Sequence, residues 1–214
     1  MPYTLDEFLA VYAAYNQALW PLPLLGTLLG LTVVALYIAR PPWGDRAVAG
    51  ILAAFWLLVG GVYHLAFFTA INPLAYAYAA LFIVQGVLLA WDGAWKARWR
   101  LGPATGWRGW LAALLVVYAL AIQPLVSLLG PRDYPDISLA GVAPCPTTLL
   151  TLGVLLLTSG GPPWRLLAIP LAWTGIGGSA AVLLGVPQDY GLIVAGALVL
   201  TVALGPSQPR PAPS

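Results

Sequence analysis

Residues 21–46 read PLPLLGTLLGLTVVALYIARPPWGDR, an apolar run that ends at Arg40 and is followed by Pro-Pro-Trp and a second arginine, Arg46. A helix needs about 20 mostly apolar residues to cross the hydrocarbon core of a bilayer. The run has about this length, and the two prolines that follow it cannot continue a helix. The stretch therefore predicts a membrane-spanning helix whose basic end lies at one membrane surface.

The rest of the chain has the same character. Of its 214 residues, 61% are hydrophobic and only 7% are charged, whereas a soluble domain is about 25% charged. This composition excludes a soluble globular domain, a disordered protein and a nucleic-acid-binding protein. Backbone groups in lipid must be hydrogen-bonded within the chain, so we expect an all-α, polytopic integral membrane protein.

Seven stretches are apolar enough to cross the membrane, and two of them are short. The predicted spans are 21–39, 46–68, 73–91, 108–129, 146–160, 163–185 and 188–204. They form one transmembrane domain over residues 1–204, with helices one to three in 21–91, a linker helix at 108–129 and helices five to seven in 146–204. We expect residues 205–214, which are rich in proline and polar types, to be a disordered cytoplasmic tail.

The basic residues predict an orientation. With seven spans, all nine Lys and Arg residues except Arg132 fall on one side of the membrane. Cytoplasmic loops carry the excess of Lys and Arg, so the N-terminus is predicted outside and the C-terminus inside. Residues 4–19 contain a capping box, Thr4 with Glu7, and predict an amphipathic helix on the outer interface.

The chain contains a candidate internal repeat. Residues 28–43 (LLGLTVVALYIARPPW) are similar to residues 149–164 (LLTLGVLLLTSGGPPW). A duplication would make spans one to three parallel to spans five to seven, with the fourth as linker. In this 3+1+3 topology alone the chain resembles the SWEET and PQ-loop transporters. The alternative is a chance similarity between apolar helices.

His64 and Cys145 are the ionisable candidates inside the spans, where such groups are costly and often functional. His64 is either a proton acceptor or metal ligand facing a cavity, or an interfacial histidine bonded to a carbonyl or water. Cys145 is either a reactive thiolate at a helix start or a packed thiol. The spacing of these residues matches no metal-binding motif, so we expect no metal and no cofactor.

Further polar residues gather toward the predicted outer side. They indicate either a polar vestibule that opens outward or simply polar outer loops, and Gly26-x-x-x-Gly30 indicates helix packing within or between protomers. The candidate substrate-binding residues are Asn16, Tyr63, His64, Asn72, Gln85, Cys145, Thr148 and Asp189.

Several short motifs resemble a family of small bacterial polytopic proteins of unknown function. They are Tyr15-Asn16, Trp20-Pro21, Gly61-Val-Tyr-His64, Ile71-Asn-Pro73 and Pro144-Cys-Pro-Thr-Thr148. The resemblance implies a multi-pass protein of the bacterial inner membrane, and it implies no activity.

Three functions remain open at this point. The first is transport or binding of a small solute or ion, and the second is a non-catalytic accessory subunit. The third is a metal- or thiol-dependent membrane enzyme that uses His64 and Cys145. The expected partners are membrane lipid, a small solute or ion and a second copy of the chain, but no nucleic acid. The basic, Trp-rich segment 92–108 is predicted to anchor the protein to lipid headgroups.

Overall fold

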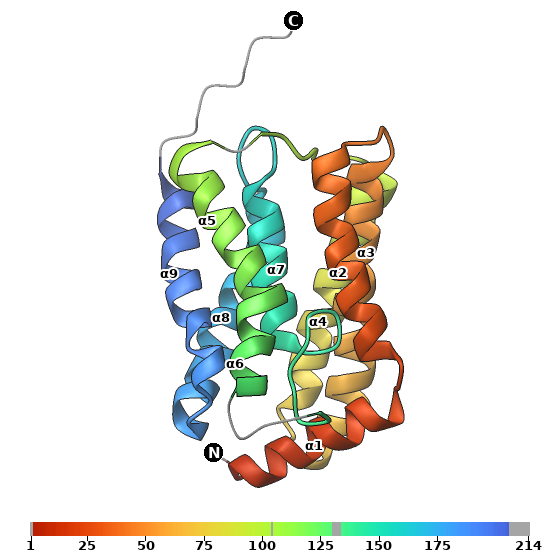
Figure 1. Ribbon diagram of the computed structural model, residues 1–214, viewed down its shortest axis with the longest axis vertical. Coiled ribbons are helices and arrows are strands. Elements are labelled where there is room, and N and C mark those ends of the chain that lie inside the picture. The colour runs from red at the N-terminus through yellow and green to blue at the C-terminus, as the bar shows by residue number, and fades with distance from the viewer. Residues whose placement is uncertain (1, 104, 130–133, 206–214) are drawn as a thin grey trace, which may run out of the picture.

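The computed structural model describes residues 2–103, 105–129 and 134–205. In these ranges the chain is a bundle of roughly parallel helices, with α1 (Leu5–Ala18) lying across one end (Figure 1). Six helical stretches are long and apolar enough to cross a membrane, by length and composition. They are Leu22–Ala39, Gly44–Ala70, Ala75–Trp95, Gly106–Leu129, Trp164–Leu184 and Pro187–Leu204.

Four of these stretches are composite. In three of them an α-helix passes into a π-helical segment, which is often found at functional sites. The segments are α3 (Gly44–Leu58) with η1 (Val59–Phe67) and η2 (Phe68–Ala70); α4 (Ala75–Leu89) with η3 (Ala90–Trp95); α5 (Gly106–Val117) with η4 (Tyr118–Ile122) and α6 (Gln123–Leu129); and η5 (Pro187–Asp189) with α9 (Gly191–Leu204). The two uninterrupted stretches are α2 (Leu22–Ala39) and α8 (Trp164–Leu184).

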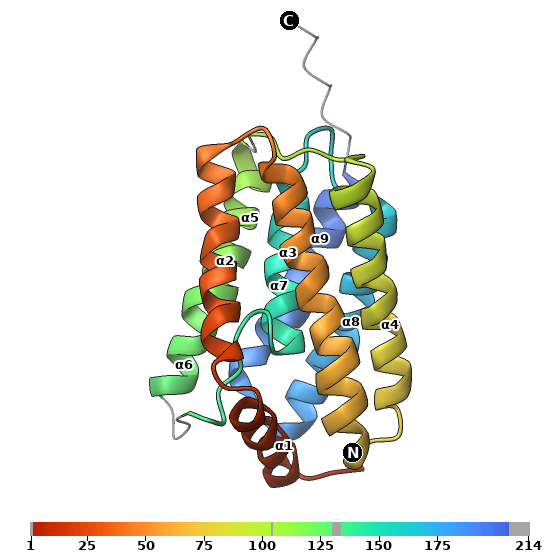
Figure 2. The ribbon, with the colours of Figure 1, turned by 90° about the vertical axis from the view of Figure 1, so that its right-hand side faces the viewer.

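One apolar helix, α7 (Pro144–Leu156), is shorter than the six long stretches and lies at the centre of the bundle, where all 13 of its residues are buried. At 1.5 Å per residue it is about 20 Å long, less than the hydrocarbon thickness of about 30 Å. The segment before it, residues 134–143, folds back into the bundle (Figures 1 and 2). The fifth predicted span, 146–160, therefore corresponds to a short helix, and a count of seven spans stays a prediction.

Glycines allow the segment before α7 to approach its neighbours. Gly141 has φ +88°, and a Cβ there would lie 2.6 Å from the ring of Phe55. A Cβ on Gly26 would lie 2.8 Å from the carbonyl oxygen of Ala140, and one on Gly30 would lie 2.6 Å from Leu120. Both glycines of the Gly26-x-x-x-Gly30 pattern thus pack against other parts of the same chain.

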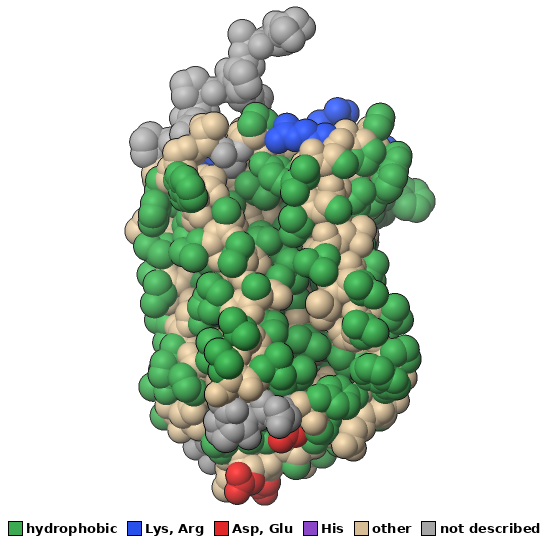
Figure 3. All heavy atoms as spheres, in the orientation of Figure 1, with side chains coloured by type: hydrophobic (Ala, Val, Ile, Leu, Met, Phe, Trp, Pro, Cys, Tyr) green, Lys and Arg blue, Asp and Glu red, His purple; other side chains and the backbone are tan. Residues whose placement is uncertain are grey.

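The predicted capping box is present at the start of α1. The Thr4 side chain accepts a hydrogen bond from the Glu7 N–H, and the Glu7 carboxylate accepts one from the Thr4 N–H at 2.7 Å. Acidic side chains gather at this end of the bundle and basic side chains at the other (Figure 3). We call these the α1 end and the basic end. The predicted tail and Arg132 lie outside the described residues.

Candidate functional site

A cavity of about 220 Å³ lies at the α1 end of the bundle, between α1, η1, α4, α7, α8 and η5. Most of its lining is aromatic or aliphatic, with a few polar groups, as is common in sites for small molecules. The lining residues that matter below are Tyr3, Tyr12, Tyr63, His64, Phe68, Asn72, Tyr78, Cys145, Trp173 and Asp189.

His64 is the central polar group of this cavity. Its side chain is fully buried (0% exposed), and neither imidazole nitrogen has a hydrogen-bond partner among the described residues. One interpretation of His64 was a hydrogen bond between its imidazole and a backbone carbonyl. The described residues form no such bond. The imidazole is left with one donor and one acceptor, or two donors when protonated.

Aromatic rings surround the imidazole, and all of them meet it edge to face. The distances between ring centroids are 5.1 Å to Tyr63, 5.9 Å to Phe68, 5.8 Å to Tyr78, 4.8 Å to Phe82 and 5.3 Å to Trp173. We call these five rings the aromatic cage. Aromatic faces carry negative charge density and attract cations, so the cage favours an electropositive group beside His64.

The close approach of η1 to α4 places His64 in the cage. A Cβ on Gly60 would lie 2.9 Å from the Cβ of Phe82 and 3.0 Å from the backbone nitrogen of Ile83. Only a residue without a side chain fits there, one turn before His64. The neighbouring Gly61 has open space around it, so the two adjacent glycines have different roles.

The phenols nearest α1 keep their protons at neutral pH. Burial raises the pKa of Tyr3 to about 12 and raises the pKa of Tyr12 well above its ordinary value. Each hydroxyl therefore remains a neutral hydrogen-bonding group. The rings of Tyr12 and Tyr63 lie 5.0 Å apart and join α1 to the aromatic cage.

Asp189 is the acidic residue among the described residues that line the cavity. It lies in η5, is buried, and accepts a hydrogen bond from the side-chain amide of Gln123. The Cys145 thiol lies close to Asp189 and Trp173. Among the described residues that line the cavity, none is Lys or Arg, so the carboxylate and the aromatic rings together favour a cation.

Five of the eight predicted site residues line this cavity: Tyr63, His64, Asn72, Cys145 and Asp189. The amide oxygen of Asn72 also accepts a hydrogen bond from the N–H of Leu74 at 3.0 Å, just before α4.

The other three predicted residues, Asn16, Gln85 and Thr148, are not among the residues that line the cavity, and each donates a hydrogen bond to a backbone carbonyl. Asn16 donates to the carbonyl oxygens of Pro135 and Ile137, at 2.6 and 2.9 Å. The Thr148 hydroxyl donates to the carbonyl oxygen of Pro144 at 2.8 Å within its own helix. Their hydrogen bonds give both residues a structural role.

Gln85 has a structural role that a proline in another helix creates. Its side-chain amide donates to the carbonyl oxygen of Leu166 at 2.9 Å. Pro170 lies inside α8 and has no N–H to offer that carbonyl four residues earlier. Gln85 supplies the missing donor and so joins α4 to α8.

Sequence reasoning missed the aromatic part of the site, above all Tyr3, Tyr12, Tyr78 and Trp173. In an apolar span an aromatic residue has the same pattern whether it faces lipid, the core or a cavity. The spacing of these residues carried no signal that distinguished them.

Among the described residues, no cluster of three or more His, Cys, Asp or Glu side chains is placed to hold a metal ion. A metal- or thiol-dependent activity of His64 and Cys145 stays a prediction from their presence at one cavity.

A family model matches residues 5–208, nearly the whole chain. The chain belongs to DUF6064. This is a family of unknown function, in agreement with the resemblance to an uncharacterised family. Comparison with curated proteins and with solved structures gives no match.

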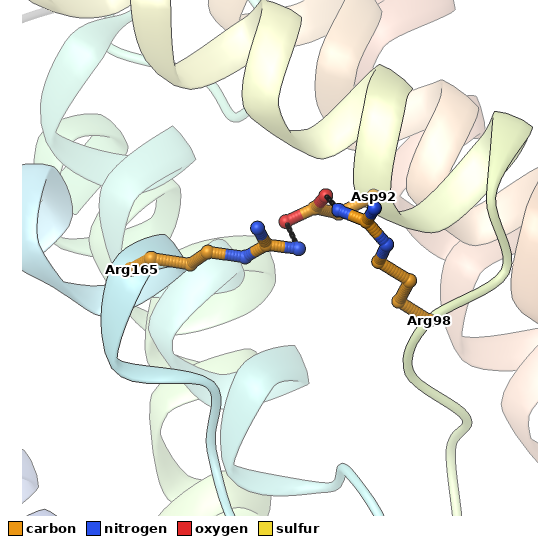
Figure 4. Close-up of polar contacts among 3 residues, drawn as sticks. All are labelled: Asp92, Arg98 and Arg165. Atoms are coloured by element: carbon orange, nitrogen blue, oxygen red, sulfur yellow. Dashed lines mark hydrogen bonds and ion pairs between the residues drawn. The ribbon is translucent and has the colours of Figure 1, made fainter.

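The basic end of this DUF6064 chain has a buried carboxylate with two partners. Asp92, in η3, has a side chain only 1% exposed. It accepts a hydrogen bond at 3.0 Å from the guanidinium of Arg98 and forms a second ion pair with Arg165 at the start of α8 (Figure 4). The pair with Arg165 joins η3 to α8 at the basic end.

An extended segment, residues 100–102, crosses the same end of the DUF6064 chain. The Gly102 N–H donates to the carbonyl oxygen of Leu157 at 2.9 Å, and the Ser159 N–H donates to that of Arg100 at 2.8 Å. The Leu101 N–H donates to the carboxylate of Asp45 at 3.3 Å. Backbone hydrogen bonds thus hold this segment across the bundle.

Proposed function

We propose that this chain is a multi-pass membrane protein that binds a small organic amine in the cavity at the α1 end. The observation that carries the proposal is the fully buried His64 imidazole, without a hydrogen-bond partner among the described residues and inside the aromatic cage. A buried polar group without a partner costs about 1–3 kcal/mol. A ligand N–H beside the imidazole would remove this cost.

The chemistry of the lining supports a cationic ligand with an apolar body. The aromatic cage contacts apolar groups and stabilises positive charge. Among the described residues that line the cavity, Asp189 is the only acidic one. A carboxylate or phosphate ligand would meet no basic side chain among the described lining residues.

The charge distribution and the candidate repeat of the sequence favour transport of the amine over binding alone. The positive-inside pattern, with Lys96, Arg98 and Arg100 at the basic end, supports an outward-facing cavity in the bacterial inner membrane. Two parallel three-helix repeats joined by a linker helix are a known transporter plan. In this plan α7 would bring the number of spans to seven. It is short, but non-helical backbone at its ends is tolerated at membrane depth when protein surrounds it.

Binding is tested with the detergent-purified protein and three ring compounds of similar size: benzylamine, benzyl alcohol and benzoate. We expect benzylamine to raise the unfolding temperature, benzyl alcohol to raise it less and benzoate to have no effect. Trp173→Phe should weaken the benzylamine effect, whereas Trp164→Phe, an exposed tryptophan on the same helix, should leave it unchanged. Equal responses to benzylamine and benzoate, or no response to any compound, would contradict the proposal.

Flux measurements separate transport from binding alone. Proteoliposomes loaded with buffer are exposed to radiolabelled benzylamine, and uptake is compared with that of the His64→Phe protein. Uptake that depends on His64 supports transport. Binding in detergent without uptake above the variant would show that the site is a receptor or accessory site.

A further inference from the structure

A second site lies at the opposite end of the molecule and shares no lining residue with the first cavity. It begins as an apolar groove of about 370 Å³ between α2 and α5, with α7 behind it. Its walls come from Val33 and Ile38 of α2 and from Ala113 and Val117 of α5. Val154 of α7 and Leu157, the residue after that helix, also line it. Figure 1 shows α2 and α5 apart at this level, with α7 visible between them.

The groove continues into a polar hollow of about 170 Å³ at the basic end. Tyr37 and Leu101 line both spaces, so the two are contiguous. Arg40 and Arg100 line the polar part. Figure 3 shows basic side chains above the apolar face at this end.

The charges around the polar hollow are not balanced. Arg40 lies over the ring of Tyr37, 5.3 Å from its centroid, and both arginines are exposed. Asp45 also lines the hollow, but its carboxylate accepts the Leu101 N–H. Among the described residues, neither Arg40 nor Arg100 forms an ion pair with a carboxylate. Two positive charges therefore face one negative charge.

The mouth of the groove is fixed by hydrogen bonds. The Tyr37 hydroxyl donates to the carbonyl oxygen of Gly102 at 3.2 Å, and the Gly102 N–H donates to Leu157. These bonds hold the backbone beside Arg100 to α2 on one side and to the end of α7 on the other. The hollow is thus preformed and does not depend on a free loop.

We propose that an anionic phospholipid binds here, with an acyl chain between α2 and α5 and its phosphate at Arg40 and Arg100. An apolar groove ending at two arginines matches the two chemical parts of such a lipid. Guanidinium groups bind phosphate oxygens through pairs of charge-assisted hydrogen bonds. A free phosphate would leave the apolar groove empty, and a zwitterionic lipid would bring an ammonium group to the arginines.

The proposal is tested by native mass spectrometry of the full chain, delipidated in detergent and then given dioleoylphosphatidylglycerol or dioleoylphosphatidylcholine. We expect one phosphatidylglycerol to be retained with at least about tenfold preference, since charged hydrogen bonds contribute about 1.5–3 kcal/mol each. Glycerol phosphate, which lacks the acyl chains, should not be retained. Equal retention of the two lipids, or retention of glycerol phosphate, would overturn the proposal.

Two pairs of variants locate the site. Arg40→Gln with Arg100→Gln should abolish the preference, whereas Arg46→Gln with Lys96→Gln removes the same charge and should keep it. Ala113→Phe should fill the groove and reduce retention, whereas Leu114→Phe on the adjacent, exposed position should not. Equal losses within either pair would refute the assignment, as would a dimer that persists without lipid and vanishes in Ala113→Phe.

Discussion

The two ends of the contact between α4 and α8, which lie side by side (Figure 2), differ in what happens to the buried polar side chain beside them. At the basic end, Asp92 is paired with Arg98 and Arg165. At the α1 end, the His64 imidazole has no hydrogen-bond partner among the described residues. Between them, Gln85 supplies a donor to the carbonyl of Leu166. Asp92 and Gln85 thus use polar groups to join helices, whereas His64 joins none through its imidazole in the described part of the chain.

This difference separates a structural role of a buried polar side chain from a candidate functional one. A buried charge must be paired, because its desolvation costs several kcal/mol. A neutral imidazole without a partner costs less, about 1–3 kcal/mol, and such a cost is tolerated at sites of function. A buried polar side chain therefore indicates helix packing at the basic end and a candidate binding site at the α1 end.

The largest expected effect is the loss of both arginines at the basic end. Arg98→Gln with Arg165→Gln leaves the Asp92 carboxylate buried and unpaired, which should lower the free energy of unfolding by about 3–5 kcal/mol. Chemical denaturation in detergent measures this. The exposed Lys96→Gln is the control and should change stability by less than about 0.5 kcal/mol. A double variant as stable as the control would remove one side of the comparison.

A smaller effect is expected from the glycine that brings η1 against α4. In Gly60→Ala the added Cβ collides with Phe82 and Ile83, and such overpacking costs about 1–3 kcal/mol. The shift should also misplace His64 and weaken benzylamine binding. Gly61→Ala adds a methyl group into open space and should preserve both stability and binding. Denaturation and ligand-dependent thermal shifts distinguish the two.

Opposite signs are expected for the two buried polar residues of the comparison. Gln85→Leu leaves the Leu166 carbonyl without a donor and should destabilise the protein by about 1–3 kcal/mol. His64→Phe removes an unsatisfied group from an aromatic cage and should stabilise it by about 1 kcal/mol while abolishing benzylamine binding. Unfolding free energies of both variants are the measurement. Destabilisation by His64→Phe to the same extent as Gln85→Leu would show that the imidazole is also structural.

The smallest effect concerns the capping box of α1. Hydrogen bonds from Thr4 lower the pKa of Glu7 below its ordinary value of 4.5. The carboxylate therefore stabilises the first turn above pH 4.5, and this contribution is lost as the pH falls through the lowered pKa. Protection of first-turn amides from hydrogen exchange, corrected for intrinsic rates, should fall in that range. Glu7→Gln, which cannot titrate, should remove this pH dependence, and an unchanged profile would contradict the assignment.

The positions of the helices were largely predictable, because lipid leaves a strong signal in composition. The predicted spans 21–39 and 163–185 differ from Leu22–Ala39 and Trp164–Leu184 by one residue at most. Span 146–160 was less accurate, since the helix runs from Pro144 to Leu156. Gly160 and Gly161 have positive φ angles and follow the helix rather than extend it.

The site was predictable only in its rare residues. His64, Cys145 and Asp189 stood out because few ionisable groups occur in or near the spans, and all three line the cavity. The hydrogen bond from Gln85 to Leu166 was not predictable, because it depends on Pro170, 85 positions further along the chain. The π-helical turn that carries His64 has no sequence signature that separates it from an α-helix.

The burial of α7 has a consequence for how the protein is made. A helix of 13 residues with prolines at its first and third positions is too short for a membrane-insertion machine to recognise as a stable span by itself. No residue of α7 faces outward, so its neighbours must already stand in the membrane to receive it. Because α8 and α9 follow α7 in the chain and pack against it together with α3 and α5, we expect α7 to be enclosed only after the later helices are made.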